Sequence, residues 1–325
     1  MTSSSRPISE ILTAKSPTFS IEFFPPKDDI GSAQLLKTAE ALKEGLSPDF
    51  VSITYGAGGS TREHTLRYAE LLKDEYGFEV MPHLTCVGHS ESELIAIIKQ
   101  FQKLGLRNIM TLRGDIPQDK EQFQPHPEGL SYASELVALI RKSFPNFCLG
   151  VAGYPEVHPE APNKEVDLEN LCYKVNQGAS FITTQLFYDN SHYFDFVKRC
   201  RASGITIPIL PGILPILSTQ QVKRFCKLCG ASIPATLGKQ LESAKESESV
   251  RQIGTDWAYQ QIKELIEKGA PGIHLYILNR PQSTLDLIER LKADGIIETP
   301  VTSSEQNTPT ELEISQSKAS EQDRL

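Results

Sequence analysis

The sequence predicts a single-domain α/β protein, a (β/α)8 TIM barrel in which parallel strands close into a ring. Short apolar runs alternate with longer segments of helical character eight times between residues 18 and 297. The runs end at turn signals such as glycine, proline or charged residues. The alternative, an open doubly wound sheet, is disfavoured because no GxGxxG fingerprint follows any of the runs, and GAGGS has the wrong spacing.

Composition excludes several classes of function. The chain has 325 residues, of which 39% are hydrophobic and 23% are charged, as is ordinary for a soluble globular protein. The net charge is −8 and no lysine/arginine run occurs, so we expect no nucleic-acid partner. No apolar run approaches the roughly 20 residues of a membrane helix, and MTSSSRPISE contains no export signal. We therefore expect a cytoplasmic protein without membrane contact.

The chain divides into three expected segments. Residues 1–17 are rich in Ser, Thr and Pro and predict a flexible N-terminal arm, with one helical turn around Ile8 to Leu12. Residues 18–297 are expected to form the barrel. Residues 298–325 are rich in Ser, Thr, Gln and Glu with few large apolar side chains, and they predict a disordered polar tail.

The strands follow from apolar runs that stop at a turn signal. The first, FSIEFF, stops at Pro25 and Pro26, and the second is followed by the glycine-rich turn GAGGS. The fourth, NIMTL, precedes an Arg-Gly-Asp triplet. The strands are expected at residues 19–24, 50–55, 79–85, 108–112, 147–153, 180–186, 207–212 and 272–278.

Helices are expected between the strands, which gives the alternation typical of βα units. A polar stretch at residues 230–248 interrupts this alternation, and we expect one additional helix between the seventh and eighth strands. The helices are expected at residues 31–45, 62–76, 90–104, 131–142, 167–177, 191–202, 218–228, 250–268 and 281–292.

The cysteines predict reduced thiols and no metal site. They lie mostly in apolar segments without the spacing of a disulfide framework. Cys226 and Cys229 form a CxxC pair within a predicted helix, with no second cysteine or histidine pair nearby. Two packed thiols are therefore favoured over a zinc or redox role.

Polar residues stand near the ends of six predicted strands, where a barrel builds its site. An apolar side chain would pack equally well at each position, so their convergence predicts a functional pocket. Taken singly, His83 could be a satisfied interior histidine and Gln185 could cap a loop. The six positions are Glu22, Thr54, His83, Arg113 with Asp115, Tyr154 and Gln185.

Glu22 carries the strongest signal, because it lies between Ile21 and Phe23 in a strand that should be buried. An isolated buried carboxylate costs several kcal/mol unless it is paired or neutralised. Desolvation raises the pKa of a carboxyl group, so we expect Glu22 to be a general acid near neutral pH.

The triplet Arg113, Gly114 and Asp115 follows the fourth strand. It can offer a guanidinium, a close backbone approach and a carboxylate to one ligand. The alternative is a surface ion pair in a loop.

The loop after the fifth strand adds a second polar cluster. Tyr154 and His158 supply flat surfaces for a planar ring system. Asp167 could simply be a helix N-cap. Lys174 follows Asn170 by one helical turn and could meet a ligand phosphate or a neighbouring acid.

Eight strings in order make the sequence resemble methylenetetrahydrofolate reductase. The resemblance runs from about Phe19 to Leu291, and the strings agree in register with the predicted barrel. They are FSIEFFPPK, VSITYGAGGSTR, PHLTC, LRGDIP, AGYPEVHPEA, TTQLFYDN, PGILPI and HLYILNR.

The resemblance implies a TIM barrel with non-covalent FAD that uses NADH or NADPH to reduce 5,10-methylenetetrahydrofolate to 5-methyltetrahydrofolate for methionine synthesis. It implies ping-pong kinetics and a homo-oligomer, either a dimer or a tetramer. Glu22 resembles the general acid that opens the substrate ring, and Asp115 resembles the acid near flavin and pterin.

Further positions match residues that contact ligands in the family. Gln185, Gln221 and Arg280 match folate-binding positions, and Phe225 matches an aromatic side chain that stacks on the bound ring. Positions matching FAD contacts are Thr54, Tyr55, Ala57, His83, Arg113, Gly114, Asp115, Ala133, Tyr154, His158, Ala161, Asp167, Asn170 and Lys174.

The chain departs from the family pattern in two places. Tyr173 stands where some relatives carry an arginine directed at the FAD phosphates, so Lys174 would carry more of that contact. Animal and yeast members add a C-terminal domain that binds S-adenosylmethionine, whereas only a polar tail follows this barrel. We therefore expect feedback by that ligand to be absent.

Two other functions compete with this interpretation. A flavin-free folate methyltransferase barrel also binds pterins in its mouth, and it would be colourless where a flavoprotein is yellow. A non-enzymatic scaffold would not need the carboxylate at position 22.

Overall fold

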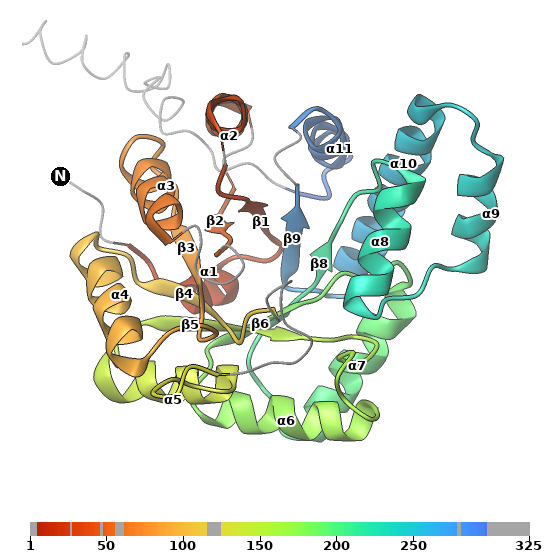
Figure 1. Ribbon diagram of the computed structural model, residues 1–325. Helices are drawn as coiled ribbons and strands as arrows, with labels where there is room; N and C mark the ends of the chain where they lie inside the picture. The colour runs from red at the N-terminus through yellow and green to blue at the C-terminus, as the bar shows by residue number, and fades with distance from the viewer. Residues whose placement is uncertain are drawn as a thin grey trace, which may run out of the picture.

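Short parallel strands form a nearly closed barrel surrounded by helices in the computed structural model (Figure 1). The structure describes residues 5–26, 28–45, 48–55, 62–115, 125–277 and 281–297. The strands pair in the order β7-β6-β5-β4-β3-β2-β1-β9-β8, and the predicted (β/α)8 barrel is confirmed. Their bounds are β1 Thr18–Phe23, β2 Phe50–Ile53, β3 Val80–Thr85, β4 Asn108–Leu112, β5 Cys148–Gly153, β6 Phe181–Thr184, β7 Ile209–Leu210, β8 Gly212–Ile213 and β9 Gly272–Tyr276.

The predicted seventh strand is split into β7 and β8 at Pro211. Ile209 pairs with β6, whereas Gly212 pairs with His274 of β9. Proline has no backbone N–H to donate to a ladder, so the strand changes partner at this residue. The carbonyl of Pro211 still accepts a hydrogen bond from the His274 N–H at 3.0 Å. One segment thus joins both edges of the sheet.

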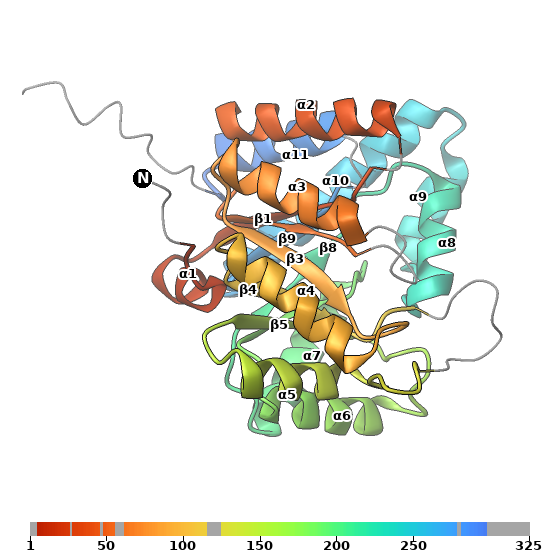
Figure 2. The same cartoon turned by 60° about the vertical axis from the view of Figure 1, so that its left-hand side comes forward.

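Helices pack around the outside of the strands (Figure 2). Outward-facing strand residues such as Ile21 and Ile53 share one apolar cluster with helix residues such as Leu35 and Leu72. The helices are α1 Ile8–Ala14, α2 Asp29–Gly45, α3 Arg62–Asp74, α4 Glu91–Lys103, α5 Ala133–Ser143, α6 Lys164–Asn176, α7 Asn190–Ala202, α8 Thr219–Cys229, α9 Ala235–Ser243, α10 Ser247–Glu267 and α11 Pro281–Ala293.

The polar stretch between β8 and β9 contains a helix, α9, that was not predicted. Three helices therefore separate these strands, where we expected two. Leu237 and Leu241 are buried one helical turn apart and hold α9 against its neighbours. Two apolar residues in a short polar segment are too weak a pattern to predict a helix.

The expected N-terminal arm contains helix α1, which includes the predicted helical turn around Ile8 to Leu12 and continues to Ala14. Ile8, Ile11 and Leu12 of α1 are buried against inward-facing side chains at the amino ends of the strands. The backbone N–H of Ile8 donates to Oδ1 of Asn108 in β4 at 2.8 Å. Helix α1 therefore closes the bottom of the barrel, at the end opposite α8 (Figure 2).

The interior of the barrel changes from apolar to polar along the strands. Phe50, Met81, Met110 and Phe181 fill the layer above α1. Higher layers contain Ser52, His83, Thr183 and other polar residues. The predicted tail at residues 298–325 lies outside the described residues. Across the described part of the chain, no helix combines the length and the apolar character that a bilayer span requires.

Candidate functional site

A cavity of about 540 Å³ opens at the carboxyl ends of the strands, where the polar strand ends were expected to meet. Its volume lies in the range typical of small-molecule sites. The predicted site residues that line it are Glu22, Thr54, Tyr55, His83, Arg113, Gly114, Asp115, Ala133, Tyr154, His158, Lys174, Gln185 and Phe225.

The remaining predicted residues are not among those lining this cavity. Ala161, Asp167 and Asn170 belong to the loop and helix after β5, and Gln221 lies one turn before Phe225 on α8. The two other predicted positions, Ala57 and Arg280, lie outside the described residues.

Glu22 sits between two imidazoles and a hydroxyl at the floor of the cavity. Its Oε2 lies 3.3 Å from Nε2 of His83 and 3.5 Å from Nε2 of His274. The Ser52 hydroxyl lies 3.4 Å from the same oxygen and 3.3 Å from Nε2 of His274. The cluster thus joins β1, β2, β3 and β9, and Glu22 is only 6% exposed.

The pKa of Glu22 corrects our expectation of a raised value. Burial does raise the pKa, but the charge of His83 and the close approach of the His274 imidazole lower it more strongly, to about 2. Glu22 is therefore ionised at neutral pH, with one imidazole from β3 and one from β9 beside its carboxylate. The paired residues are far apart in sequence, so local pattern could not reveal them.

Arg113, Gly114 and Asp115 all border the cavity. The guanidinium of Arg113 donates to both carboxylate oxygens of Glu160, at 2.6 and 2.5 Å. The ion-pair alternative was thus partly correct, although the partner is Glu160. Gly114 has φ +94°, and a Cβ there would lie 2.3 Å from Cγ1 of Val87, so this turn requires glycine.

The loop after β5 brings two rings together at the cavity wall. The Tyr154 and His158 rings meet edge to face, with centroids 4.5 Å apart. The backbone N–H of Glu160 donates to Nδ1 of His158 at 3.1 Å, so the neutral imidazole carries its proton on Nε2. Burial raises the pKa of Tyr154 to about 12 and lowers that of His158.

Asp167 is not the N-cap that we considered. The N-cap of α6 is Asn163, whose side chain accepts a hydrogen bond from the Val166 N–H. Asp167 lies inside the first turn, and its Oδ2 accepts from the His158 N–H at 3.0 Å. It therefore fixes the loop that carries the two rings.

Lys174 reaches the cavity from α6, and its ammonium donates to the carbonyl of Ala152 at 2.7 Å. The side chain is partly exposed to the cavity, but protein surrounds the ammonium. This burial lowers the pKa of Lys174 to about 8, against a smaller upward effect of Asp167. Tyr173, the departure from the family pattern, is 61% exposed.

Sequence reasoning missed His274 and Tyr276, the two inward-facing residues of β9. Both line the cavity, and their rings meet edge to face at 5.4 Å. In the string HLYILNR, His274 and Tyr276 are two residues apart and therefore point to the same side of the strand, a pattern that could have identified them. Two further lining hydroxyls, those of Thr85 and Thr183, have no hydrogen-bond partner within the described part of the chain.

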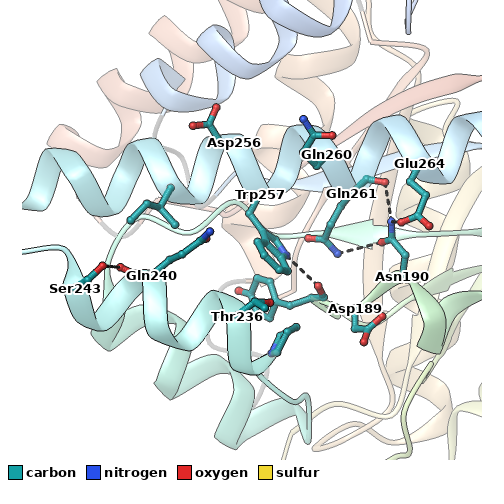
Figure 3. Close-up of a pocket in the computed structure, with 13 residues that line it drawn as sticks. Asp189, Asn190, Thr236, Gln240, Ser243, Asp256, Trp257, Gln260, Gln261 and Glu264 are labelled. Atoms are coloured by element: carbon teal, nitrogen blue, oxygen red, sulfur yellow. Dashed lines mark hydrogen bonds between the residues drawn. The ribbon is translucent and has the colours of Figure 1, made fainter.

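A second cavity of about 680 Å³ lies between α9, α10 and the start of α7 (Figure 3). Several of its polar groups already bind other protein groups. The indole N–H of Trp257 donates to the Tyr188 carbonyl, and Asn190 donates to Glu264. Asp256 accepts from Arg290 at 2.5 Å. This cavity lies outside the barrel mouth and lacks the paired acid and bases of the first.

The CxxC pair spans the wall of the barrel mouth. Cys229 lines the cavity, whereas Cys226 packs in the apolar cluster behind α8. Burial raises the pKa of each thiol to about 11. Among the described residues, no three His, Cys, Asp or Glu side chains are placed to bind one metal ion.

Comparison with known proteins identifies the family. A family model of methylenetetrahydrofolate reductase matches residues 7–292. The 5,10-methylenetetrahydrofolate reductase of Escherichia coli is 37% identical over 273 residues, which cover 84% of this chain and 90% of that protein. Methylenetetrahydrofolate reductase 2 of Saccharomyces cerevisiae is 35% identical over 285 residues, which cover 86% of this chain but only 48% of that protein.

A solved structure supports the fold. A Clostridium thermocellum protein, described as binding two copies of 5-methyl-5,6,7,8-tetrahydrofolic acid, superposes with a TM-score of 0.61 at 16% identity. The alignment covers 88% of this chain and 99% of that structure. The family model and the relatives extend over nearly the whole barrel. The chain therefore belongs to the methylenetetrahydrofolate reductase family.

Proposed function

We propose that this protein reduces 5,10-methylenetetrahydrofolate to 5-methyltetrahydrofolate, with NADH or NADPH as reductant and FAD as the bound carrier of electrons. The observation that carries the proposal is the buried cluster of Glu22 with His83 and His274 at the floor of the barrel mouth. A reaction that consumes a proton needs such a group beside its substrate. Membership of the reductase family specifies which reaction that is.

The cavity has the donor groups that FAD would need. Arg113, paired with Glu160, and Lys174 are cations that line the cavity and suit a diphosphate. The hydroxyls of Thr85 and Thr183, which have no partner among the described residues, suit polar groups of a ligand. Tyr154 and His158 offer ring surfaces nearby. Bound flavin would supply hydride transfer between the nicotinamide and the folate.

Another part of the cavity suits the folate and the nicotinamide, which would bind there one after the other. Gln185 and Phe225 border the cavity from β6 and α8. Gln221, one turn before Phe225, accepts from the Leu217 N–H through Oε1. Its buried Nε2 has no hydrogen-bond partner among the described residues. Folate and nicotinamide sharing one wall would give ping-pong kinetics.

Glu22 and Asp115 have distinct roles in the proposed chemistry. Glu22 passes a proton to N10 of the substrate, the bond from N10 to the methylene carbon breaks, and a cationic iminium forms at N5. Asp115 at the cavity rim favours that cation by Coulomb attraction. Bound flavin would supply the hydride that completes the methyl group.

The proposal is tested with Glu22→Gln in the purified flavoprotein. The amide keeps the size of the side chain but cannot transfer a proton. We expect the variant to stay yellow and to oxidise NADH or NADPH at the wild-type rate, while reduction of methylenetetrahydrofolate is lost. Unchanged folate turnover would remove Glu22 from the mechanism. A colourless protein that cannot be reconstituted with FAD would refute the flavoenzyme and favour a flavin-free pterin enzyme.

A further inference from the structure

The Glu22 cluster includes His274, the more buried of the two imidazoles that line the cavity beside Glu22. His274 is 1% exposed and lies on β9, where it pairs in register with Ser20 of β1. Its ring stacks on Phe50 at a centroid distance of 6.0 Å. A histidine at this depth could be a simple packing residue, so its hydrogen bonds decide what it does.

Those bonds fix which nitrogen carries the exchangeable proton. The Ser20 hydroxyl donates to the carbonyl of Ile273 at 3.1 Å, so it has no proton left for the imidazole. Nδ1 of His274 lies 2.8 Å from that hydroxyl, and with the serine proton assigned to the carbonyl, Nδ1 is assigned as the donor. The exchangeable proton is therefore on Nε2, the nitrogen that faces Glu22 and Ser52.

The path from Nε2 to the substrate is short. Nε2 lies 3.5 Å from Glu22 Oε2 directly, and the Ser52 hydroxyl bridges the same two atoms at 3.3 and 3.4 Å. Glu22 in turn lines the cavity. A proton can thus move from Nε2 to the carboxylate, either directly or through the Ser52 hydroxyl.

We propose that His274 holds the proton that Glu22 delivers to the folate, and that Ser20 and Ser52 keep it aligned for that transfer. This inference rests on the proposed function, because it needs Glu22 as the group that meets the substrate. The imidazolium loses one proton to Glu22, Glu22 gives one to N10, and the electron pair of the broken C–N bond stays on N10. His274 recovers a proton from solvent through Glu22 when the folate leaves the cavity.

The low pKa of Glu22 agrees with a role in which Glu22 delivers the proton and does not hold it, since the carboxylate is ionised at neutral pH. Few other titratable groups within the described structure compete for the role. Tyr276 faces the His274 ring but donates its hydroxyl proton to the Thr184 carbonyl at 2.7 Å. His83 also faces Glu22 and lines the cavity as His274 does, but it is more exposed, 7% against 1%, and no serine hydroxyl among the described residues bonds its ring.

The test compares pH profiles of the two half-reactions in the FAD-loaded enzyme. Flavin reduced under anaerobic conditions is mixed with methylenetetrahydrofolate from about pH 6 to pH 9, and its reoxidation is followed by stopped flow. We expect the wild-type rate to fall as pH rises. His274→Gln should lower the rate about 100-fold at neutral pH and abolish that pH dependence, while flavin reduction by NADH or NADPH is unchanged.

Two further variants keep the inference falsifiable. Ser52→Ala removes the bridge with little change in volume and should slow only the folate half-reaction. His89→Gln alters another buried histidine, outside the Glu22 cluster, and should keep the wild-type profile. If His274→Gln retains the pH dependence, or if His83→Gln abolishes it instead, the assignment of His274 is overturned.

Glu22→Gln separates this inference from the proposed function. Loss of folate reduction in Glu22→Gln together with a normal profile in His274→Gln would overturn only the proton source. Full folate reduction in Glu22→Gln would overturn the role of Glu22 itself.

Discussion

Replacing Lys174 with methionine should have opposite effects on the stability of the FAD-free protein and on flavin binding. The ammonium is held by one hydrogen bond to the Ala152 carbonyl and is otherwise surrounded by protein. Methionine has a similar length and no charge. The change therefore removes a desolvation penalty and, at the same time, a cation that we assign to the FAD diphosphate.

The magnitude follows from the pKa. Burial lowers the pKa of Lys174 from 10.5 to about 8, which at about 1.4 kcal/mol per pH unit corresponds to about 3 kcal/mol. Partial exposure to the cavity reduces this to about 1–2 kcal/mol. Loss of the hydrogen bond offsets about 1 kcal/mol of the gain.

The pH dependence isolates the effect of the charge. Below pH 8 both the folded and the unfolded chain carry the proton, and the penalty is complete. Between pH 8 and 10.5 only the unfolded chain keeps the proton, so wild-type stability rises with pH. The methionine variant lacks this rise. Other groups titrate equally in both proteins and cancel in the difference between them.

The assay is urea unfolding of FAD-free wild type and Lys174→Met at pH 7.5 and at pH 10.5. We expect the free energy of unfolding of the variant, relative to wild type, to fall by about 1–2 kcal/mol between these pH values. Lys164→Met, a more exposed lysine of the same helix, is the control and should show no such change. Equal differences at both pH values would refute the reasoning. In parallel, FAD affinity should weaken about 10- to 100-fold in Lys174→Met only.

Three further predictions concern the turn, the rim acid and the barrel bottom. Gly114→Ala should destabilise the protein by more than about 2 kcal/mol, because it adds a clash with Val87 to an unfavourable φ. Gly204→Ala, with a similar φ and open space, should cost only about 1 kcal/mol, and equal melting temperatures would contradict the clash. Asp115→Asn should slow the folate half-reaction about 100-fold and change the flavin potential, and no change in either would remove Asp115 from the site. Ile8→Ala should cost about 2–5 kcal/mol in urea unfolding, and a negligible loss would mean that α1 does not close the barrel.

The barrel could be predicted because each of its strands is a local apolar run. Asn108–Leu112 was predicted to the residue, and most other strands to within a few residues. The failures had non-local causes. Helix α1 is longer than the predicted turn because it packs on the bottom of the barrel, and the seventh strand changes partner at Pro211 because two distant strands must be joined.

The site could be predicted only in part, for the same reason. Two rules predicted that Glu22, His83 and Arg113 lie at one cavity: side chains alternate along a strand, and barrel sites form at the carboxyl ends of the strands. The state of Glu22 could not be predicted, because its pKa depends on imidazoles from β3 and β9. Burial alone argued for a raised pKa, and the paired imidazoles reverse it. His274 and Tyr276, on the eighth predicted strand, were not predicted as site residues.

The central claim is that one cavity passes electrons from a nicotinamide through FAD to methylenetetrahydrofolate, with the proton entering through Glu22. Anaerobic stopped flow tests it most directly, by mixing the yellow protein first with NADH or NADPH and then with methylenetetrahydrofolate. We predict that the flavin absorbance is lost in the first step and returns in the second, and that Glu22→Gln blocks only the second. If the flavin of the wild-type protein is reduced in the first step but is not reoxidised by the folate in the second, the account is contradicted.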